Sequence, residues 1–123
     1  MLKIAEVQKL VAMVFGAVLL LVGILGFVPV IGQPLLLGIF GVNTFQNILH
    51  VVGGVVGLWL GSQGSGKGFN TWLGYISGLV AVLGFVPPTA ALLASLLGIN
   101  MAITVLHAAI AVVTLGVAYG VKE

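Results

Sequence analysis

Four long apolar stretches dominate the pattern of hydrophobic and polar positions along the chain. A helix that spans a membrane needs about 20 consecutive, mostly apolar residues. Stretches that meet this requirement occupy residues 7–28, 44–60, 71–86 and 101–121. Prolines follow the first and third stretches, at Pro29 and Pro87, where they would end a helix. The pattern therefore predicts an all-α protein, an integral membrane bundle of four helices.

The same order of residues occurs twice along the chain. The segment VGILGFVP at residues 22–29 returns as VAVLGFVP at residues 80–87, which is an offset of 58 positions. Beyond the loop that follows, the offset is 57 and relates Asn43 to Asn100. A change of one residue within a loop is easily tolerated. The pattern indicates a duplicated unit.

Each unit would contain two spanning helices. The first unit covers residues 7–61 and the second covers residues 71–121, within a single membrane domain of residues 1–123. A Gly/Ser-rich linker at residues 62–70 joins them. Because each unit crosses the membrane twice, the two units are parallel tandem repeats whose symmetry axis would lie along the membrane normal.

A short apolar helix is expected between the two spans of each unit, at residues 34–40 and 90–97. Residues that favour helix starts and ends flank both segments: Pro34, Thr89, Gly41 and Gly98. Both segments are apolar on all sides, which is unusual for a loop in water. We therefore expect these helices to lie in the outer leaflet or against a partner.

Composition agrees with a membrane location. Hydrophobic residues make up 61% of the chain and charged residues 5%, whereas a soluble domain carries about 25% charged residues. The net charge of +2 comes from scattered lysines and makes no basic patch for a nucleic acid. The chain has no cysteine, which excludes disulfides and thiolate metal sites.

The distribution of charge predicts the orientation. With four crossings, both termini and the linker lie on one side of the membrane. That side holds every lysine of the chain: Lys3, Lys9, Lys67 and Lys122. The opposite loops, residues 29–42 and 87–99, carry no charge. By the positive-inside rule the lysine side is cytoplasmic, so both termini are expected in the cytoplasm.

One motif resembles a known family. A Gly-Phe-Val-Pro helix end is followed by an apolar stretch and by Gly-Val-Asn-x-x-x-Asn-x-x-His at the start of a glycine-rich helix. This order resembles the bacterial four-pass membrane proteins of domain-of-unknown-function family 4383. The first unit has all three polar side chains of the motif: Asn43, Asn47 and His50. The second unit keeps Asn100 and His107 but has Thr104 in place of the middle asparagine. The resemblance covers nearly the whole chain. It implies a four-pass fold in a bacterial inner or thylakoid-type membrane, and it implies no activity.

Two histidines, His50 and His107, are the candidate functional residues. Each lies seven residues after an asparagine that would cap its helix, about 10 Å into the membrane from the outer end. An ionisable residue at such a depth indicates function by default. The two imidazoles could ligate a haem iron, or one could ligate a chlorophyll magnesium. Alternatively, they tie the bundle together in a polar cluster with Asn43, Asn47 and Asn100, or they line a path for protons or polar solutes.

Small residues recur at four-residue spacing on the predicted helices: Gly53, Gly57, Gly61, Gly74 and Gly78. Such spacing lets helix backbones approach closely in lipid, within the bundle or in a homo-oligomer. The linker resembles a phosphate-binding loop as far as Lys67, but Gly68 stands where Ser or Thr would bind magnesium. We therefore expect no nucleotide.

No enzyme site is expected. The only acidic side chains, Glu6 and Glu123, lie across the membrane from both histidines, so neither an acid–base pair nor a Ser/His/Asp arrangement can form. No set of metal ligands is apparent. The leading hypothesis is a non-catalytic accessory or structural subunit, or an assembly partner, of a larger membrane complex. The alternatives are a haem- or chlorophyll-binding protein and a small permease.

The predicted topology can be tested with the variant Ser65→Cys. In intact cells, this cysteine should react with membrane-permeant thiol reagents but not with impermeant ones, because the linker is expected in the cytoplasm. The unmodified chain has no cysteine and is the control. If an impermeant reagent labels this cysteine in intact cells, the predicted orientation is wrong.

Overall fold

The computed structural model of the protein describes residues 4–32 and 35–121. Four residues used in the sequence analysis lie outside the described residues: Lys3, Pro34, Lys122 and Glu123. The helices are α1 (Ile4–Leu25), α2 (Thr44–Ser62), α3 (Gly66–Phe85), α4 (Pro87–Leu97) and α5 (Met101–Gly120). In the described part of the chain, all of these except α4 are long and apolar enough to cross a membrane. The prediction of an all-α protein with four spanning helices is therefore confirmed.

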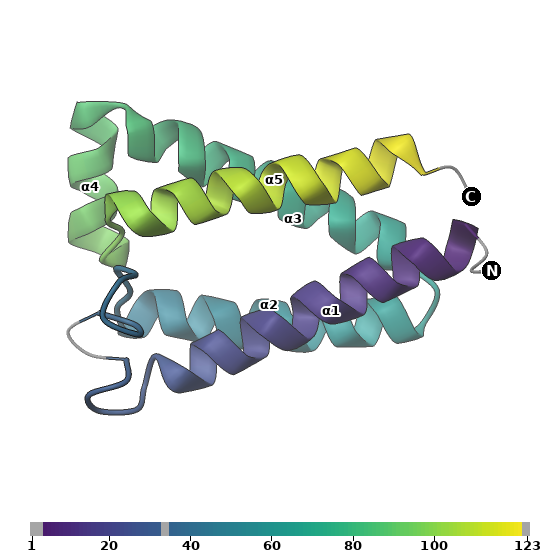
Figure 1. Ribbon diagram of the computed structural model, residues 1–123, viewed down its shortest axis with the longest axis horizontal. Coiled ribbons are helices and arrows are strands. Elements are labelled where there is room, and N and C mark those ends of the chain that lie inside the picture. Colours follow the sequence, from purple (N-terminus) through teal and green to yellow (C-terminus); the bar gives the residue numbers. More distant parts are fainter. Residues whose placement is uncertain (1–3, 33–34, 122–123) are drawn as a thin grey trace.

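The helices form two pairs that lie side by side (Figure 1). One pair is α1 with α2, and the other is α3 with α5. The short helix α4 lies at the end opposite the termini (Figure 1). We call the end that carries Lys9 and Lys67 the lysine end, and the end that carries α4 the capped end.

Within the first pair, glycines allow the backbones of α1 and α2 to touch. A Cβ on Gly54 would collide with the backbone nitrogen of Leu20, and a Cβ on Gly16 would lie 2.8 Å from that of Leu58. By contrast, a Cβ on Gly53 would meet only a methyl group of Leu19, at 3.7 Å. Small residues at helix contacts are what drives packing in lipid, where no hydrophobic effect favours association.

The glycines singled out from the sequence differ in their surroundings. A Cβ on Gly57 would lie 2.5 Å from the ring of Phe69, which joins the two pairs, and one on Gly61 would lie 2.8 Å from Met13. A Cβ on Gly74 would lie 2.5 Å from Leu115, whereas Gly78 has room for one. The backbone contacts between α1 and α2 at Gly16 and Gly54 involve glycines that the sequence analysis did not name as packing sites.

Only one of the two expected short helices exists among the described residues. Helix α4 begins at Pro87, three residues earlier than predicted, with Val86 rather than Thr89 as its N-cap. Prolines fit the first turn of a helix because their missing N–H would have no partner there. The Thr89 hydroxyl instead donates back to the Leu83 carbonyl at 2.5 Å. Gly98 ends the helix in the left-handed conformation, as expected (φ 70°).

The prediction of a helix at residues 34–40 is wrong. The backbone N–H of Leu36 donates to the Phe40 carbonyl at 2.8 Å, and that of Phe40 donates to the Leu36 carbonyl at 3.0 Å. The chain between them makes a tight reversal. Leu37 and Gly38 both have positive φ angles, 55° and 74°. A glycine inside a helix is unfavourable, and two left-handed residues in succession turn the chain back. Gly41 therefore ends no helix, and its Cα packs against the Gly98 carbonyl.

Helix α3 begins at Gly66, earlier than the predicted residue 71. A Cβ on Gly66 would lie 2.6 Å from the backbone oxygen of Gln8, so the first turn of α3 packs on α1. The Asn70 side chain donates to the Gln8 backbone and side-chain oxygens at 3.1 and 3.0 Å. These contacts stabilise a helical start in a glycine-rich segment that resembles a linker in sequence.

Buried amide side chains join the helix pairs at the lysine end. Gln8, 1% exposed, donates from Nε2 to the backbone oxygens of Val117 and Val121, at 2.9 Å each. With the bonds from Asn70, this single glutamine connects α1 to α3 and α5. Interhelical hydrogen bonds of this kind hold helices together where no water competes.

Two asparagines join the helix pairs at the capped end. The Oδ1 atoms of Asn43 and Asn100 accept from Gln46 N and Ile103 N and so cap α2 and α5, as predicted. Asn43 Nδ2 donates to the Leu96 carbonyl and Asn100 Nδ2 donates to the Ile39 carbonyl, each at 3.0 Å. The two donors and the two acceptors are each 57 positions apart, the offset of the sequence repeat.

The tight contact at Gly54 can be tested against its neighbour. Gly54→Ala should lower the free energy of unfolding by about 1–3 kcal/mol, because the new Cβ overlaps the backbone of α1. Gly53→Ala is the control and should be neutral or stabilise by up to about 1 kcal/mol, since alanine favours helix. Denaturant titrations in detergent micelles measure both. Equal effects of the two substitutions would contradict the packing described.

The two roles of Asn100 can be separated by substitution. Asn100→Ala should cost about 2 kcal/mol of stability, because the N-cap and the bond to the Ile39 carbonyl are both lost. Asn100→Ser keeps an oxygen that can cap α5 but cannot reach Ile39, so it should cost about half as much. The same titrations measure this. A serine variant as unstable as the alanine variant would show that the cap contributes nothing.

Candidate functional site

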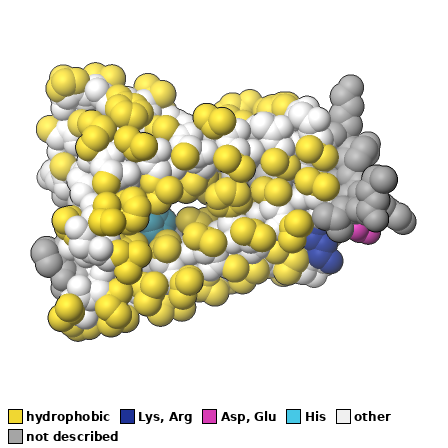
Figure 2. All heavy atoms as spheres, in the orientation of Figure 1, with side chains coloured by type: hydrophobic (Ala, Val, Ile, Leu, Met, Phe, Trp, Pro, Cys, Tyr) yellow, Lys and Arg dark blue, Asp and Glu magenta, His cyan; other side chains and the backbone are white. Residues whose placement is uncertain are grey.

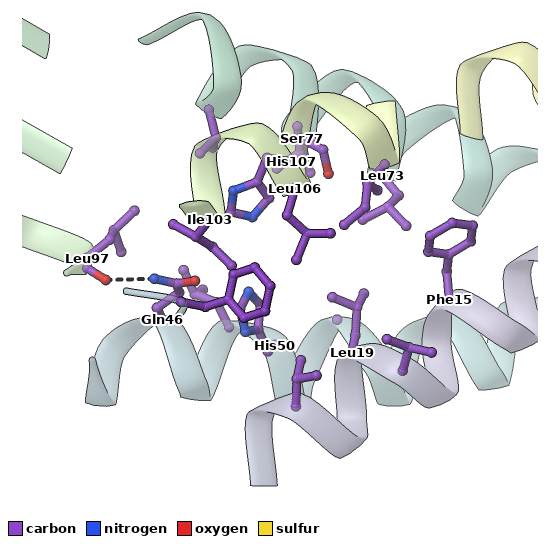
Figure 3. Close-up of a pocket in the computed structure, with 18 of the residues that line it drawn as sticks. Phe15, Leu19, Gln46, His50, Leu73, Ser77, Leu97, Ile103, Leu106 and His107 are labelled. Atoms are coloured by element: carbon purple, nitrogen blue, oxygen red, sulfur yellow. Dashed lines mark hydrogen bonds between the residues drawn. The ribbon is translucent and has the colours of Figure 1, made fainter. Parts of the chain in front are cut away.

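A cavity lies between the two helix pairs (Figure 3). Its volume is about 560 Å³, and all four spanning helices line it. Its lining is apolar apart from a few side chains: Gln46, His50, Trp72, Ser77 and His107. No charged side chain among the described residues lines it. The cavity therefore suits a neutral occupant that is largely apolar.

The two candidate histidines face each other across this cavity. His50 projects from α2 and His107 from α5, and Figure 3 shows the rings turned toward one another. The ring centres are 6.4 Å apart and the ring planes are inclined by 49°. Two residues 57 positions apart are thus brought together across the cavity, which the sequence alone left open.

Neither imidazole has a hydrogen bond to another helix among the described residues. The Nδ1 atoms of His50 and His107 are buried and have no partner at hydrogen-bond geometry. The Ile103 carbonyl, one turn earlier on α5, lies near the His107 ring. A buried polar group without a partner costs about 1–3 kcal/mol. Among the described residues, the buried Nδ1 atoms therefore do not tie the two helix pairs together.

Gln46 is a further polar residue of the site, and we did not predict it. It lies one turn before His50 on the same face of α2. Its Nε2 donates to the Gly41 and Leu97 carbonyls at 3.1 and 2.7 Å, and its Oε1 is buried without a partner. The Gln46 side chain does not bond Asn43, although the Gln46 backbone N–H donates to the Asn43 side chain at 2.8 Å. Gln46 lies four residues before His50, and this spacing could have placed it on the same helix face as the histidine from the sequence alone.

The asparagines of the motif do not join the histidines. Asn47 is 1% exposed and packs against α1, where Gly26 leaves room for its Oδ1 atom. Asn43 and Asn100 bond backbone carbonyls at the capped end. None of the three lines the cavity. The structure therefore brings the two histidines together and places the asparagines elsewhere.

The histidines lie near one end of the cavity. Along α2 the lining runs from Gln46 to Leu60, so it extends about 6 Å from His50 toward the capped end and about 15 Å toward the lysine end. On the short side, the Gln46 side chain donates to the Leu97 carbonyl (Figure 3). The long side is lined by apolar groups such as Phe15, Leu19 and Leu73 (Figure 3). The cavity thus has a polar end and an apolar extension.

The cavity is open on the side of the bundle. Figure 2 shows a hollow between α5 and α1, with a histidine side chain visible at its end toward α4. Because the helices cross the membrane, the sides of the bundle face acyl chains. The hollow therefore opens toward lipid.

The side chains of the site offer binding groups. A neutral imidazole presents one donor and one acceptor nitrogen, and either ring can instead ligate a metal. Among the described residues, no group of three or more His, Cys, Asp or Glu side chains could hold a metal ion. The arrangement can thus hold a polar group or a metal centre that a ligand itself carries.

The family of the chain follows from a comparison with family models. The model described as "Domain of unknown function (DUF4383)" matches residues 9–120. Comparison with curated proteins and with solved structures found no match. The matched region includes nearly all of the five helices and every residue that lines the cavity. The chain therefore belongs to the DUF4383 family of proteins.

Proposed function

We propose that this chain is a non-catalytic membrane protein that binds a small lipophilic molecule between its helix pairs. The observation that supports this is the facing pair of imidazoles, 6.4 Å apart, whose buried nitrogens lack partners within an apolar cavity. A ligand that bonds His50 and His107 would remove the cost of leaving them unsatisfied. The lysine end is proposed to face the cytoplasm of a bacterium.

The dimensions of the cavity support binding. Ligand pockets usually measure about 300–1,000 Å³ and are mostly apolar with a few polar groups, and this cavity, at about 560 Å³, falls within that range. Its opening toward lipid gives a membrane-dissolved molecule direct access. Hydrogen bonds join the helix pairs at both ends of the bundle, from Asn70 to Gln8 and from Gln46 to the Leu97 carbonyl. A bundle joined at both ends favours binding over the permease alternative.

A metal-bearing tetrapyrrole is a second candidate, which the distance between the rings favours. One metal between two imidazoles, with bonds of about 2.0–2.1 Å, places the ring centres roughly 6 Å apart. Two features weigh against it. A flat macrocycle centred between the histidines needs equal room on both sides, but Gln46 closes one side. Carboxylates on a haem would also be buried without a cationic partner, which is costly.

An accessory role in a larger membrane complex stays a proposal and is compatible with ligand binding. Helix α5 carries Gly116 and Gly120, four residues apart, and no atom lies within 4 Å of a Cβ built on either one. Small residues at this spacing suit close approach by another membrane helix. That helix would come from a partner protein or from a second copy of this chain.

One purification tests these proposals together. Protein isolated gently from its native membrane should carry about one lipophilic molecule per chain, identified by extraction and mass spectrometry. The double variant His50→Phe, His107→Phe keeps two rings of similar size but should lose about tenfold in occupancy, because the hydrogen bonds are gone. An absorption band that this variant loses would instead identify a tetrapyrrole, and proteins that co-purify would support the accessory role.

The control is Val105→Phe, which adds a ring to α5 at an exposed residue outside the cavity. It should keep full occupancy. Wild-type protein that carries only bulk phospholipid, in no fixed ratio to the chain, would contradict the proposed function.

A further inference from the structure

The distance between the imidazoles restricts what can lie between them. The ring centres are 6.4 Å apart, and each ring nitrogen lies about 1.2 Å from its centre, so a nitrogen of one ring can come no closer than roughly 4 Å to a nitrogen of the other. This is too long for a direct hydrogen bond, which needs about 2.7–3.2 Å. A single oxygen placed to one side of the line between the nitrogens can bond both. The gap therefore fits one oxygen atom.

The hydroxyl proposal assigns one proton to each neutral ring. Both Nδ1 atoms are buried without a partner, and we place the His107 proton on Nδ1, on the side of the Ile103 carbonyl one turn earlier in the same helix. The other ring nitrogen of His107, Nε2, is then a hydrogen-bond acceptor. His50 has no hydrogen-bond acceptor at its buried Nδ1, so its proton is better placed on the nitrogen that faces the cavity, as a donor.

A donor on one side and an acceptor on the other match a hydroxyl group. A hydroxyl accepts from His50 and donates to His107, whereas a carbonyl or ether oxygen can use only the donor. An ionised head group is disfavoured because no charged side chain lines the cavity among the described residues. The Gln46 amide nitrogen, one turn from His50, already bonds the Gly41 and Leu97 carbonyls and offers a larger polar head group no free donor.

The apolar extension indicates where the rest of the ligand lies. It runs about 15 Å from His50 toward the lysine end, past Leu19, Leu73 and Phe15. The opening between α1 and α5 admits such a chain from the bilayer (Figure 2). On the basis of the proposed function, we infer that the ligand is a neutral long-chain or isoprenoid alcohol, with its hydroxyl between His50 and His107 and its hydrocarbon toward the lysine end.

Retinol is a suitable probe because it is an isoprenoid alcohol that absorbs where tryptophan emits. Trp72 lines the cavity, and the other tryptophan, Trp59, does not. In the variant Trp59→Phe, reconstituted in vesicles, retinol should quench the Trp72 emission by energy transfer. Retinyl methyl ether and retinal have the same hydrocarbon but cannot donate a hydrogen bond. Each should bind about tenfold more weakly than retinol, because the acceptor on His107 is left without a partner.

Substitutions assign the two hydrogen bonds. In the same background, His107→Phe should weaken retinol about tenfold and leave retinal nearly unchanged, since retinal makes no bond to His107. His50→Phe should weaken both. Val105→Phe is again the control and should change neither affinity.

The outcomes separate the two levels of the proposal. If retinol, retinal and the ether bind equally well, the hydroxyl inference is wrong while the cavity remains a binding site for lipophilic molecules. If a folded Trp59→Phe protein shows no saturable quenching with any of the three, the proposed function is contradicted as well. If His107→Phe weakens retinal as much as retinol, the assignment of His107 as the acceptor is overturned.

Discussion

The bundle depends on buried side-chain amides that bond backbone carbonyls at its two ends. In lipid, apolar side chains gain little by leaving acyl chains for one another, so the helix pairs need specific contacts to stay together. Gln8 supplies them at the lysine end, and Asn43, Gln46 and Asn100 supply them at the capped end. Between these ends the pairs are joined mainly by apolar contacts, and a cavity remains.

Packing within the helix pairs depends on close contacts at glycines, whereas the contacts between the pairs depend on side-chain amides. Glycines bring α1 and α2 to backbone contact at Gly16 and Gly54, whereas Gly74 and Gly84 of α3 meet side chains of α5. The histidines project from the second helix of each pair, so their separation is set by how the amide bonds hold one pair against the other. The geometry of the site is thus coupled to bonds that lie about one or two turns away from it.

The sequence predicted those features that depend on one helix at a time. Span length and apolar content located four helices, and asparagine at two helix starts predicted both N-caps correctly. Features that depend on a distant partner were not predictable in this way. The early start of α3 requires Gln8, and the inward position of Gln46 requires the carbonyl of Leu97. The helix expected near Leu37 failed because local glycine content outweighed the analogy with the second unit.

The predicted duplication would account for the meeting of two histidines that lie 57 positions apart, and the differences between the predicted units make the two sides of the polar end unlike. Residues 57 positions apart exchange equivalent hydrogen bonds at the capped end, as two copies related by a twofold axis would. The equivalent of Gln46 in the second unit is Ile103, so one side of the polar end carries an amide and the other a hydrocarbon side chain. A ligand between two imidazoles with identical surroundings could bind in two equivalent orientations. The difference between Gln46 and Ile103 makes these two orientations unequal.

Three buried polar atoms of the cavity, on the two imidazoles and on Gln46, have no partner among the described residues, and burial without a partner lowers stability. A ligand of the proposed kind that bonds these atoms would stabilise the folded bundle by its own binding free energy. In that proposal ligand binding and the association of the two helix pairs are linked, because α2 and α5 carry the histidines and begin at the asparagines that hold the pairs together.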